Sequence, residues 1–429
     1  MGQTIAEKII ARAAGKEAVV PGEYVVLKNI VGPIVYSWKG FSGTKHLESL
    51  SSAVGVKKAA KPEKCIINGD HLQPPLSIDE VLQSKAVRKQ AEEMGIKKVY
   101  DHGEGIGHMV NIEKGDILPG TAFVSFDPQA SFAGGIGAFY TGGGRFGSHF
   151  IEAYALGEIT ICVPGTIKVE INGSLHRNIT SRDIWFKVFA DLGPSAAYGM
   201  IFEFSGSTID KMDMEQRMVL CGNTAFAGSD GAIIQSDEAT QKWFKDWLDM
   251  DVDIVKSDAD ASYSKVYKYQ AEDFVSMVTY PPDMFTAKPA SEFRNVKISQ
   301  CVIGTCAGGT LNDLRIAASI LKGQKIHKDI RYIVSPITQR VFVQASNEGL
   351  LSVLAEAGAQ IITPTCDICM GAIAPLAPGD VSLSQQTLNV PGRSGSHEAD
   401  IYLASSATIA ASAITGYITD PNIFENGSH

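Results

Sequence analysis

The sequence predicts an α/β fold built mainly on parallel sheets. Short apolar segments with strand-like composition alternate with longer helical patterns along almost the whole chain, an order typical of parallel strands joined by helices. The chain has 429 residues, about three times the length of a typical domain of ~150 residues. We therefore expect several α/β domains, which we place at residues 1–165, 166–290 and 291–429.

The first segment is expected to begin with a helix and to continue with strands around a second helix. In MGQTIAEKIIARAAGKE, apolar residues from Ile5 to Ala13 recur at helical spacing. The stretches YVVLKNI, KCIING and TAFVSF have the composition of strands. Between the last two, SIDEVLQSKAVRKQAEEMG starts with a capping Ser77 and ends with Gly95, which predicts a helix between these residues.

The rest of the chain continues the alternation. TIKVEINGSLHRNIT predicts a hairpin that turns at Asn172 and Gly173, because Asn-Gly favours tight hairpin turns. SRDIWFKVFADLG is expected to form the next helix. The polar, Pro-containing segment 254–295 is expected to connect two domains. After it, KISQCVIGTC predicts a buried strand, and TLNDLRIAASILKG predicts a helix capped by Thr310.

Charge and composition exclude several classes of function. A net charge of −9 disfavours binding to nucleic acid or to an anionic membrane surface, since both require a basic face. No run of ~18 apolar residues is present, so we expect no membrane span. The N-terminus lacks the uninterrupted apolar core of a signal peptide. An odd number of cysteines, seven, fits a disulfide framework poorly, so we expect reduced thiols and a cytoplasmic protein.

Three cysteines occupy positions where ligands gather in α/β proteins. Cys306 ends an apolar strand, and Cys366 and Cys369 follow the apolar stretch GAQIITPT. Because ligands collect at the carboxyl ends of parallel strands, these thiols could converge on one metal centre. Thiolates suit iron–sulfur clusters or zinc, while buried inert cysteines are the alternative without a ligand. Three thiolates on a four-iron cluster would leave one iron open as a Lewis acid.

Longer tracts around these cysteines resemble a known family. CVIGTCAGGTLNDLRIAASILKGQKI, TPTCDICMGAIAPLAPGD and GRSGSHEADIYLASSATIAASAITGYITDP resemble the aconitase superfamily, and within it the large subunits of 3-isopropylmalate dehydratases. The resemblance extends over essentially the whole chain. It implies three-layer α/β/α domains, the first three domains of the aconitase type without its mobile fourth, or swivel, domain. It also implies that Cys306, Cys366 and Cys369 ligate a [4Fe–4S] cluster whose fourth iron takes the substrate.

The same resemblance carries acid–base residues over to this chain. NGDHLQPP supplies the pair Asp70 and His71, DHGEGIGHMV supplies His108, and MIFEFSG supplies Glu203. Imidazole can donate a proton to a departing hydroxyl near neutral pH, and a carboxylate beside the ring orients it. Without the resemblance, each lone histidine would more often be structural. The Gly-rich turns do not complete the G-x-G-x-x-G pattern of a dinucleotide site.

Several positions depart from the family pattern. In SFDPQASFAGG, Asp127 is kept, but Pro128 and Gln129 replace a serine and a histidine. Near the C-terminus the family's Asn-Arg-Asn becomes Thr387, Leu388 and Asn389, whereas Arg393 is kept. After Cys306, the family's Thr-Asn-Ser becomes Ala-Gly-Gly. We expect Gln129, Asn389 and Arg393 to face the substrate, with His102, Arg145 or His149 as candidates to replace lost contacts.

The resemblance therefore implies a hydro-lyase that acts on a small hydroxy acid other than citrate or isopropylmalate, because a guanidinium that would clamp a carboxylate is lost. The chain ends where the family's large subunits end, so a small swivel-domain subunit is expected to supply the catalytic base. The alternative is a degenerate member that lost turnover and serves as a binding or regulatory subunit. Zinc held by the three thiolates is a further alternative to the cluster.

Overall fold

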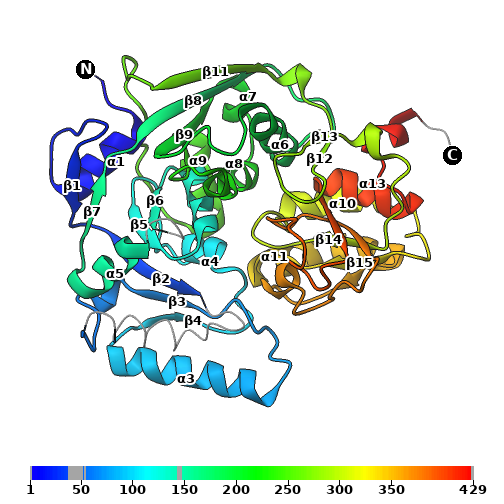
Figure 1. Ribbon diagram of the computed structural model, residues 1–429, viewed down its shortest axis with the longest axis horizontal. Helices are drawn as coiled ribbons and strands as arrows, with labels where there is room; N and C mark the ends of the chain where they lie inside the picture. Colours follow the sequence, from blue (N-terminus) through cyan, green and yellow to red (C-terminus); the bar gives the residue numbers. More distant parts are fainter. Residues whose placement is uncertain (1, 37–51, 53–54, 143–146, 427–429) are drawn as a thin grey trace. The chain divides into compact units, whose positions relative to one another are not determined.

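The computed structural model (Figure 1) describes residues 2–36, 52, 55–142 and 147–426. The chain forms two compact units. Unit 1 comprises residues 1–102, 107–172 and 195–269, and unit 2 comprises residues 103–106, 173–194 and 270–429. Within the described ranges, no helix combines the length and the apolar composition needed to cross a bilayer.

A five-stranded parallel sheet forms the base of unit 1, with the strand order β4-β3-β2-β5-β6. Its strands are β2 (Val31–Tyr36), β3 (Ile66–Asn68), β4 (Lys98–Tyr100), β5 (Ala122–Ser125) and β6 (Phe139–Gly142). Because every neighbouring pair is parallel, the carboxyl ends of all these strands lie at one edge of the sheet. KCIING and TAFVSF form β3 and β5 as predicted, whereas YVVLKNI forms β1 (Tyr24–Leu27), which pairs outside this sheet with β7 (Ile159–Cys162).

The helices of this part begin and end at the capping residues that the sequence indicates. Thr4 and Glu7 form a capping box at the start of α1, and Gly15 ends it. Ser77 caps α3 and Gly95 ends it, as predicted. The helices are α1 (Ile5–Ala14), α3 (Ile78–Met94), α4 (Gly107–Glu113) and α5 (Gly147–Leu156).

A second sheet of unit 1 has the order β10-β9-β8-β11, in which β8, β9 and β10 are parallel. Its strands are β8 (Gly165–Asn172), β9 (Met200–Ser205), β10 (Ala232–Ile234) and β11 (Lys265–Gln270). The helices of this part are α7 (Ser207–Asp210), α8 (Met214–Gly222) and α9 (Glu238–Leu248). The chain passes into unit 2 after Tyr269, within the segment expected to connect two domains.

The predicted hairpin at Asn172 and Gly173 is wrong. The first half forms β8, but residues 173–180 form no strand, and the neighbours of β8 are β9 and β11. The loop is held by Glu272 instead, whose carboxylate accepts a hydrogen bond of 2.8 Å from the Ser174 amide. The Asn-Gly turn is therefore present, but a long-range contact directs the chain away from the sheet.

Unit 2 contains a five-stranded parallel sheet with the order β16-β15-β14-β17-β18. Its strands are β14 (Gln300–Ile303), β15 (Arg331–Val334), β16 (Gln360–Ile361), β17 (Val381–Ser384) and β18 (Asp400–Leu403). A short antiparallel pair joins β12 (Met277–Val278) and β13 (Lys288–Pro289). The helices are α6 (Ser181–Leu192), α10 (Leu311–Leu321), α11 (Gln339–Asn347), α12 (Leu350–Ala357) and α13 (Ser406–Thr415).

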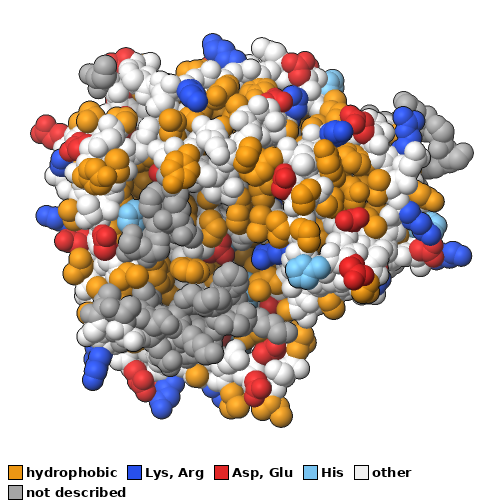
Figure 2. Space-filling model, in the orientation of Figure 1, with side chains coloured by type: hydrophobic (Ala, Val, Ile, Leu, Met, Phe, Trp, Pro, Cys, Tyr) orange, Lys and Arg blue, Asp and Glu red, His pale blue; other side chains and the backbone are white. Residues whose placement is uncertain are grey.

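Short 3-10 helices complete the secondary structure: η1 (Pro62–Lys64), η2 (Pro128–Ile136), η4 (Thr224–Ala227), η5 (Ala271–Asp273), η6 (Ala290–Phe293), η7 (Asp367–Met370) and η8 (Pro421–Asn426). Parallel sheets connected by helices confirm the predicted α/β class. The three predicted domain segments each contain most of one larger sheet, and that division stays a prediction. On the face shown in Figure 2, Lys and Arg side chains are interspersed with Asp and Glu rather than gathered in one field.

A stability test follows from the core of unit 1. Ile67 lies on β3 with 1% exposure and belongs to an apolar cluster with Ile9, Ile10 and Val124. Replacing a fully buried isoleucine by alanine removes apolar contact and leaves a cavity, so Ile67→Ala should lower the free energy of unfolding by about 2–5 kcal/mol. Urea denaturation followed by circular dichroism measures this change. Val20→Ala, at a side chain that is 61% exposed, should change it by less than about 0.5 kcal/mol.

Candidate active site

The predicted acid–base residues of unit 1 lie along the carboxyl edge of its five-stranded sheet. Asp70 and His71 follow β3, Asp127 follows β5, and His108 lies in the first turn of α4. Parallel pairing brings these loops to the same edge although they are far apart in sequence. The sequence therefore assembles a cluster of two imidazoles and two carboxylates at this edge.

Asp70 holds two groups in place. One carboxylate oxygen lies 2.8 Å from Nδ1 of His71, and the other accepts a 2.9 Å hydrogen bond from the Gly107 amide at the start of α4. Asp70 is 2% exposed and His71 is 5% exposed, so the pair is screened little by water. The carboxylate fixes the orientation of the imidazole and stabilises positive charge on it.

His108 is held in a different electrostatic state. Its Nδ1 lies 3.0 Å from the Tyr36 hydroxyl, and its Nε2 lies 3.9 Å from the Asp127 carboxylate. Burial lowers the pKa of His108 below its ordinary value, although the charges of Asp127 and Asp70 oppose this shift. Burial thus favours the neutral form of the His108 ring.

Tyr36 contacts His108 at this edge, although the sequence did not predict it as a site residue. It ends β2, and its ring lies tilted by 58° against the His108 ring, with 4.8 Å between the centroids. Its hydroxyl accepts a 3.4 Å hydrogen bond from the Ser125 hydroxyl. The apolar stretch that contains it gives no local sign of function. Only the parallel pairing of β2 with β3 and β5 places its hydroxyl beside the imidazole.

The departures at Pro128 and Gln129 have a local structural explanation. Asp127 caps η2, and its carboxylate accepts a 2.8 Å hydrogen bond from the Gln129 amide. Proline is well suited to the first position of such a turn, because its missing N–H would have no partner there. The Gln129 side chain is buried, so it can face a neutral group in the interior without titrating.

Glu203 lies on β9, in the other sheet of unit 1. Its two carboxylate oxygens accept hydrogen bonds from Tyr263 at 2.8 Å and Ser257 at 2.9 Å. Burial raises the pKa of Glu203, and these two hydroxyls oppose that shift. The carboxylates that act on His108 are Asp127 and Asp70, so the contacts of Glu203 are those of a structural carboxylate. A role for it in the reaction stays a prediction.

Two further candidate substrate contacts of unit 1, His102 and His149, interact with residues close to them in sequence. The His102 backbone donates a 2.7 Å hydrogen bond to Asp101, and the His149 ring lies 3.1 Å from the Thr141 hydroxyl. Arg145 lies outside the described residues.

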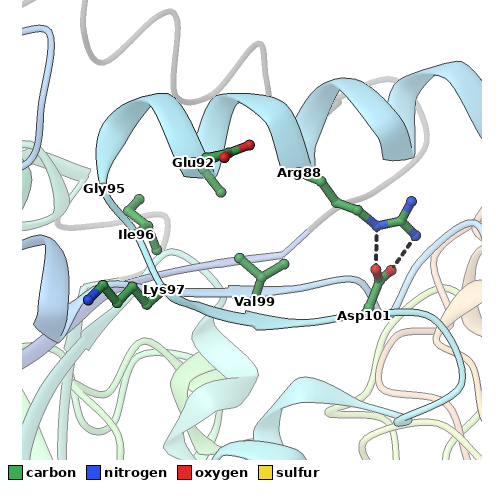
Figure 3. A pocket seen from close by; sticks show the side chains of 8 residues that line it. Arg88, Glu92, Gly95, Ile96, Lys97, Val99 and Asp101 are labelled. Atoms are coloured by element: carbon green, nitrogen blue, oxygen red, sulfur yellow. Dashed lines mark hydrogen bonds and ion pairs between the residues drawn. The ribbon is translucent and has the colours of Figure 1, made fainter.

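A separate hollow beside α3 is lined by Arg88, Ala91, Glu92, Gly95, Ile96, Lys97, Val99 and Asp101 (Figure 3). Figure 3 shows the Arg88 guanidinium directed at the Asp101 carboxylate, which also accepts the hydrogen bond from the His102 amide.

The three cysteines of unit 2 gather at the carboxyl edge of its sheet. Cys306 follows β14, and Cys366 and Cys369 follow β16 and flank the start of η7. Each is at most 6% exposed. The charges of all three thiols act on one side chain, because the thiolates of Cys369, Cys366 and Cys306 all raise the pKa of the Arg393 guanidinium. The three thiols therefore lie close enough to one guanidinium for their charges to act on it.

Arg393 contacts the thiol group of Cys369 directly. One Nη donates a 3.2 Å hydrogen bond to Sγ of Cys369, and the Thr387 hydroxyl lies 3.8 Å from the same sulfur. Burial would raise the pKa of this thiol, but the charge and hydrogen bond of Arg393 bring it below its ordinary value. Among the described residues, Nε of Arg393 and Oδ1 of Asn389 have no hydrogen-bond partner. Both buried groups could face a polar ligand.

The loop before Cys306 is strained and tightly packed. Thr305 has φ of +73°, a conformation that a β-branched residue adopts only where surrounding contacts enforce it. Its hydroxyl donates to the Gln385 carbonyl at 3.3 Å. Gly308 is required here, because a Cβ would lie 2.2 Å from Oε1 of Gln385. The glycines that replace the family's Thr-Asn-Ser make room for the Gln385 side chain.

The donor set fits an iron–sulfur cluster. Three buried thiols around a guanidinium provide soft sulfur ligands together with a cation that offsets their negative charge. In the part of the chain that the structure describes, no three His, Cys, Asp or Glu side chains stand in the arrangement that holds a single metal ion.

Comparison with known proteins places the chain in a family. The family model described as Aconitase family (aconitate hydratase) matches residues 71–287 and 282–416. The chain belongs to the aconitase family. It is a hydro-lyase of the isopropylmalate dehydratase type, as the resemblance predicted. It is 36% identical to the 3-isopropylmalate dehydratase large subunit of Heliobacterium modesticaldum, over 99% of this chain and 100% of that one.

Other relatives agree with this assignment. Large subunit 1 of the 3-isopropylmalate dehydratase of Pyrococcus furiosus is 38% identical, over 98% of each chain. The corresponding subunit of Methanopyrus kandleri is 35% identical, over 98% of this chain and 99% of that one. The crystal structure of Thermococcus kodakaraensis aconitase X in its holo-form is 12% identical, with a TM-score of 0.47, over 89% of this chain and 88% of that one.

The lowered pKa of His108 predicts a pH dependence of stability. Above about pH 6.5 the ring is neutral in both the folded and the unfolded chain, so His108 does not affect the balance. As pH falls below about 6.5, the unfolded chain takes up the proton first, and stability is lost until the folded-state pKa is reached. Urea denaturation at pH 7.5 and 5.5 should therefore show a smaller loss of stability for His108→Gln than for the wild type.

The exposed His176 provides the control for this experiment. His176→Gln should keep the loss of stability that the wild type shows between the two pH values. An unchanged loss in His108→Gln would contradict the assignment of a neutral buried ring.

Proposed function

We propose that the chain is the large subunit of a [4Fe–4S]-dependent hydro-lyase that removes water from, or adds it to, a small hydroxy carboxylic acid. The observation that carries the proposal is the group of three buried thiols around Arg393 in a chain of the aconitase family. Cys306, Cys366 and Cys369 would hold the cluster through their sulfur atoms. When bound, the cluster supplies a Lewis acid that polarises a substrate hydroxyl.

The residues of the chain would supply proton transfer and orientation. His71, positioned by Asp70, would give a proton to the departing hydroxyl, because the neighbouring carboxylate favours the charged ring before the transfer. His108, whose neutral form is favoured by burial, would orient the reacting group through its Nε2, while the Tyr36 hydroxyl holds its Nδ1. Such positioning and general acid catalysis act on the same step, and each contributes to lowering the barrier.

The substrate would differ from citrate and isopropylmalate at two contacts. Gln129 offers a neutral amide where the family usually has a titratable histidine, and Leu388 offers an apolar surface where the family has a guanidinium. Leu388 against a desolvated carboxylate would leave that charge unpaired at a cost of several kcal/mol. A neutral or apolar substituent therefore suits these positions better. Arg393 keeps its Nε as a donor for a carboxylate at the cysteine edge, and Oδ1 of Asn389 remains an acceptor for a hydroxyl group.

A small partner subunit would complete the enzyme. The relatives matched over their full length are named large subunits, and in the family the catalytic base belongs to the swivel domain that such chains lack. The alternative of a degenerate binding subunit would need an explanation for the retained Asp70–His71 pair and the three thiols. Metal and activity measurements separate the two proposals.

The first test is metal content after anaerobic purification. The wild type should contain four irons and four sulfides per chain, and Cys366→Ser should lose the cluster and at least about 99% of the activity of the complete enzyme. Cys301→Ala is the matched control, since Cys301 is buried on β14 and its thiol donates only to the Ile409 carbonyl at 3.8 Å. Zinc without sulfide in the wild type, or activity in Cys366→Ser without iron, would refute the proposal.

The second test is reconstitution with a 3-isopropylmalate dehydratase small subunit from a relative. A missing general base typically costs 10²–10⁴-fold in rate, so adding the small subunit should raise turnover by roughly 10²–10⁴-fold. Initial rates of water addition or removal, followed by absorbance of the conjugated double bond, measure the change. Full turnover by the large chain alone would contradict the expected division of labour.

A further inference from the structure

Arg182 is a buried cation on α6 of unit 2, and the sequence predicted only a helix around it. It is 2% exposed. One Nη donates a 3.1 Å hydrogen bond to the Gln386 carbonyl, and the guanidinium lies 4.8 Å above the Phe186 ring. Its Nε has no hydrogen-bond partner among the described residues. A charged group in such a position requires an anion, because burying an unpaired charge is costly.

The acidic residues near Arg182 do not bind it directly. The Asp313 carboxylate accepts hydrogen bonds from the Thr310 hydroxyl and the Gln385 side-chain amide, both at 2.8 Å. The Asp183 carboxylate accepts hydrogen bonds from the backbone amides of Thr180 and Met277, both at 2.9 Å. Burial lowers the pKa of Arg182 to about 10, and these carboxylates oppose the shift only at a distance. The Nε donor of the guanidinium therefore remains available for an anion.

Arg182 contacts the loop in which Leu388 stands where the family has an arginine. Gln386, which accepts from Arg182, also donates its side-chain amide to the Leu388 carbonyl at 2.7 Å. The thiols of Cys306 and Cys369 act on the Arg182 charge, so the guanidinium lies at the cysteine edge of the sheet. A cation from α6 thus reaches the loop in which Leu388 replaces the family's arginine.

We propose that Arg182 binds a second carboxylate of the substrate and so replaces the guanidinium lost at Leu388. The proposal rests on the function proposed above. Arg393 directs one Nη to Cys369 and keeps its Nε for the first carboxylate, while Arg182 offers its Nε to the second. The substrate would then remain a dicarboxylate, and Leu388 would face a part of it that carries no charge.

A matched pair of ligands tests this assignment in the anaerobically reconstituted complex with the small subunit. Malate is the simplest 2-hydroxy dicarboxylate, and lactate is the same molecule with hydrogen in place of the second carboxylate. Isothermal titration calorimetry should show that Arg182→Gln weakens binding of the dicarboxylate about 10–100-fold, the range expected for a charged hydrogen-bonded contact. Binding of the monocarboxylate should change by less than about twofold.

Three controls make the outcome specific. Arg182→Lys keeps the charge but not the planar donor pair and should lose roughly 3–10-fold in dicarboxylate affinity; it also serves if the Gln variant fails to fold. Arg315→Gln, at an exposed Arg–Glu pair, should leave both affinities unchanged. Iron, sulfide and visible absorption should equal those of the wild type in every variant.

Several results would overturn the assignment. Unchanged dicarboxylate affinity in Arg182→Gln, or a wild type that binds both ligands equally, would remove Arg182 from substrate binding. Loss of iron and sulfide in Arg182→Gln would show that the residue supports the cluster instead. A wild-type chain without iron and sulfide would refute the proposed function itself, and this result is read independently of ligand affinity.

Discussion

The contact of Arg393 with the Cys369 thiol, close to the charges of Cys366 and Cys306, is the interaction on which the candidate chemistry depends. A thiol in an apolar interior stays protonated, as at Cys301, where burial raises the pKa and no cation opposes it. Five residues later in the chain, Cys306 lies with Cys366 and Cys369 around a guanidinium, and the pKa of Cys369 falls below its ordinary value. The cation thus distinguishes the Cys369 thiol from the equally buried Cys301 thiol.

Both units use the same geometric device to bring distant residues together. In unit 1 the strand ends collect Asp70, His71 and Asp127, and in unit 2 they collect the cysteines and Arg393. A parallel sheet places every carboxyl end at one edge, so each βα loop can contribute a side chain without disturbing the core. Backbone contacts then fix the loops, as the Gly107 amide does for Asp70.

Local signals made much of this architecture predictable from the sequence. Ser77, Gly95 and Thr310 mark helix ends correctly because capping depends on neighbouring residues only. The hairpin at Asn172 was wrong because the outcome depended on Glu272, a residue about a hundred positions away. Arg182 was missed for the same reason, since its function depends on a carbonyl of a loop that follows β17.

The departures from the family pattern come with compensating contacts, and this favours a changed specificity over decay. The space that Gly308 leaves is filled by Gln385, whose side chain accepts from the Gly309 amide at 3.2 Å and donates to Asp313 at 2.8 Å. Random loss of function would leave cavities and unpaired polar groups where substrate contacts had been. Here Gln385 fills the space beside Gly308, and Nε of Arg393 and Nε of Arg182 are among the buried donors without a hydrogen-bond partner in the described residues. The polar groups left open at the cysteine edge are therefore the ones suited to an anionic ligand.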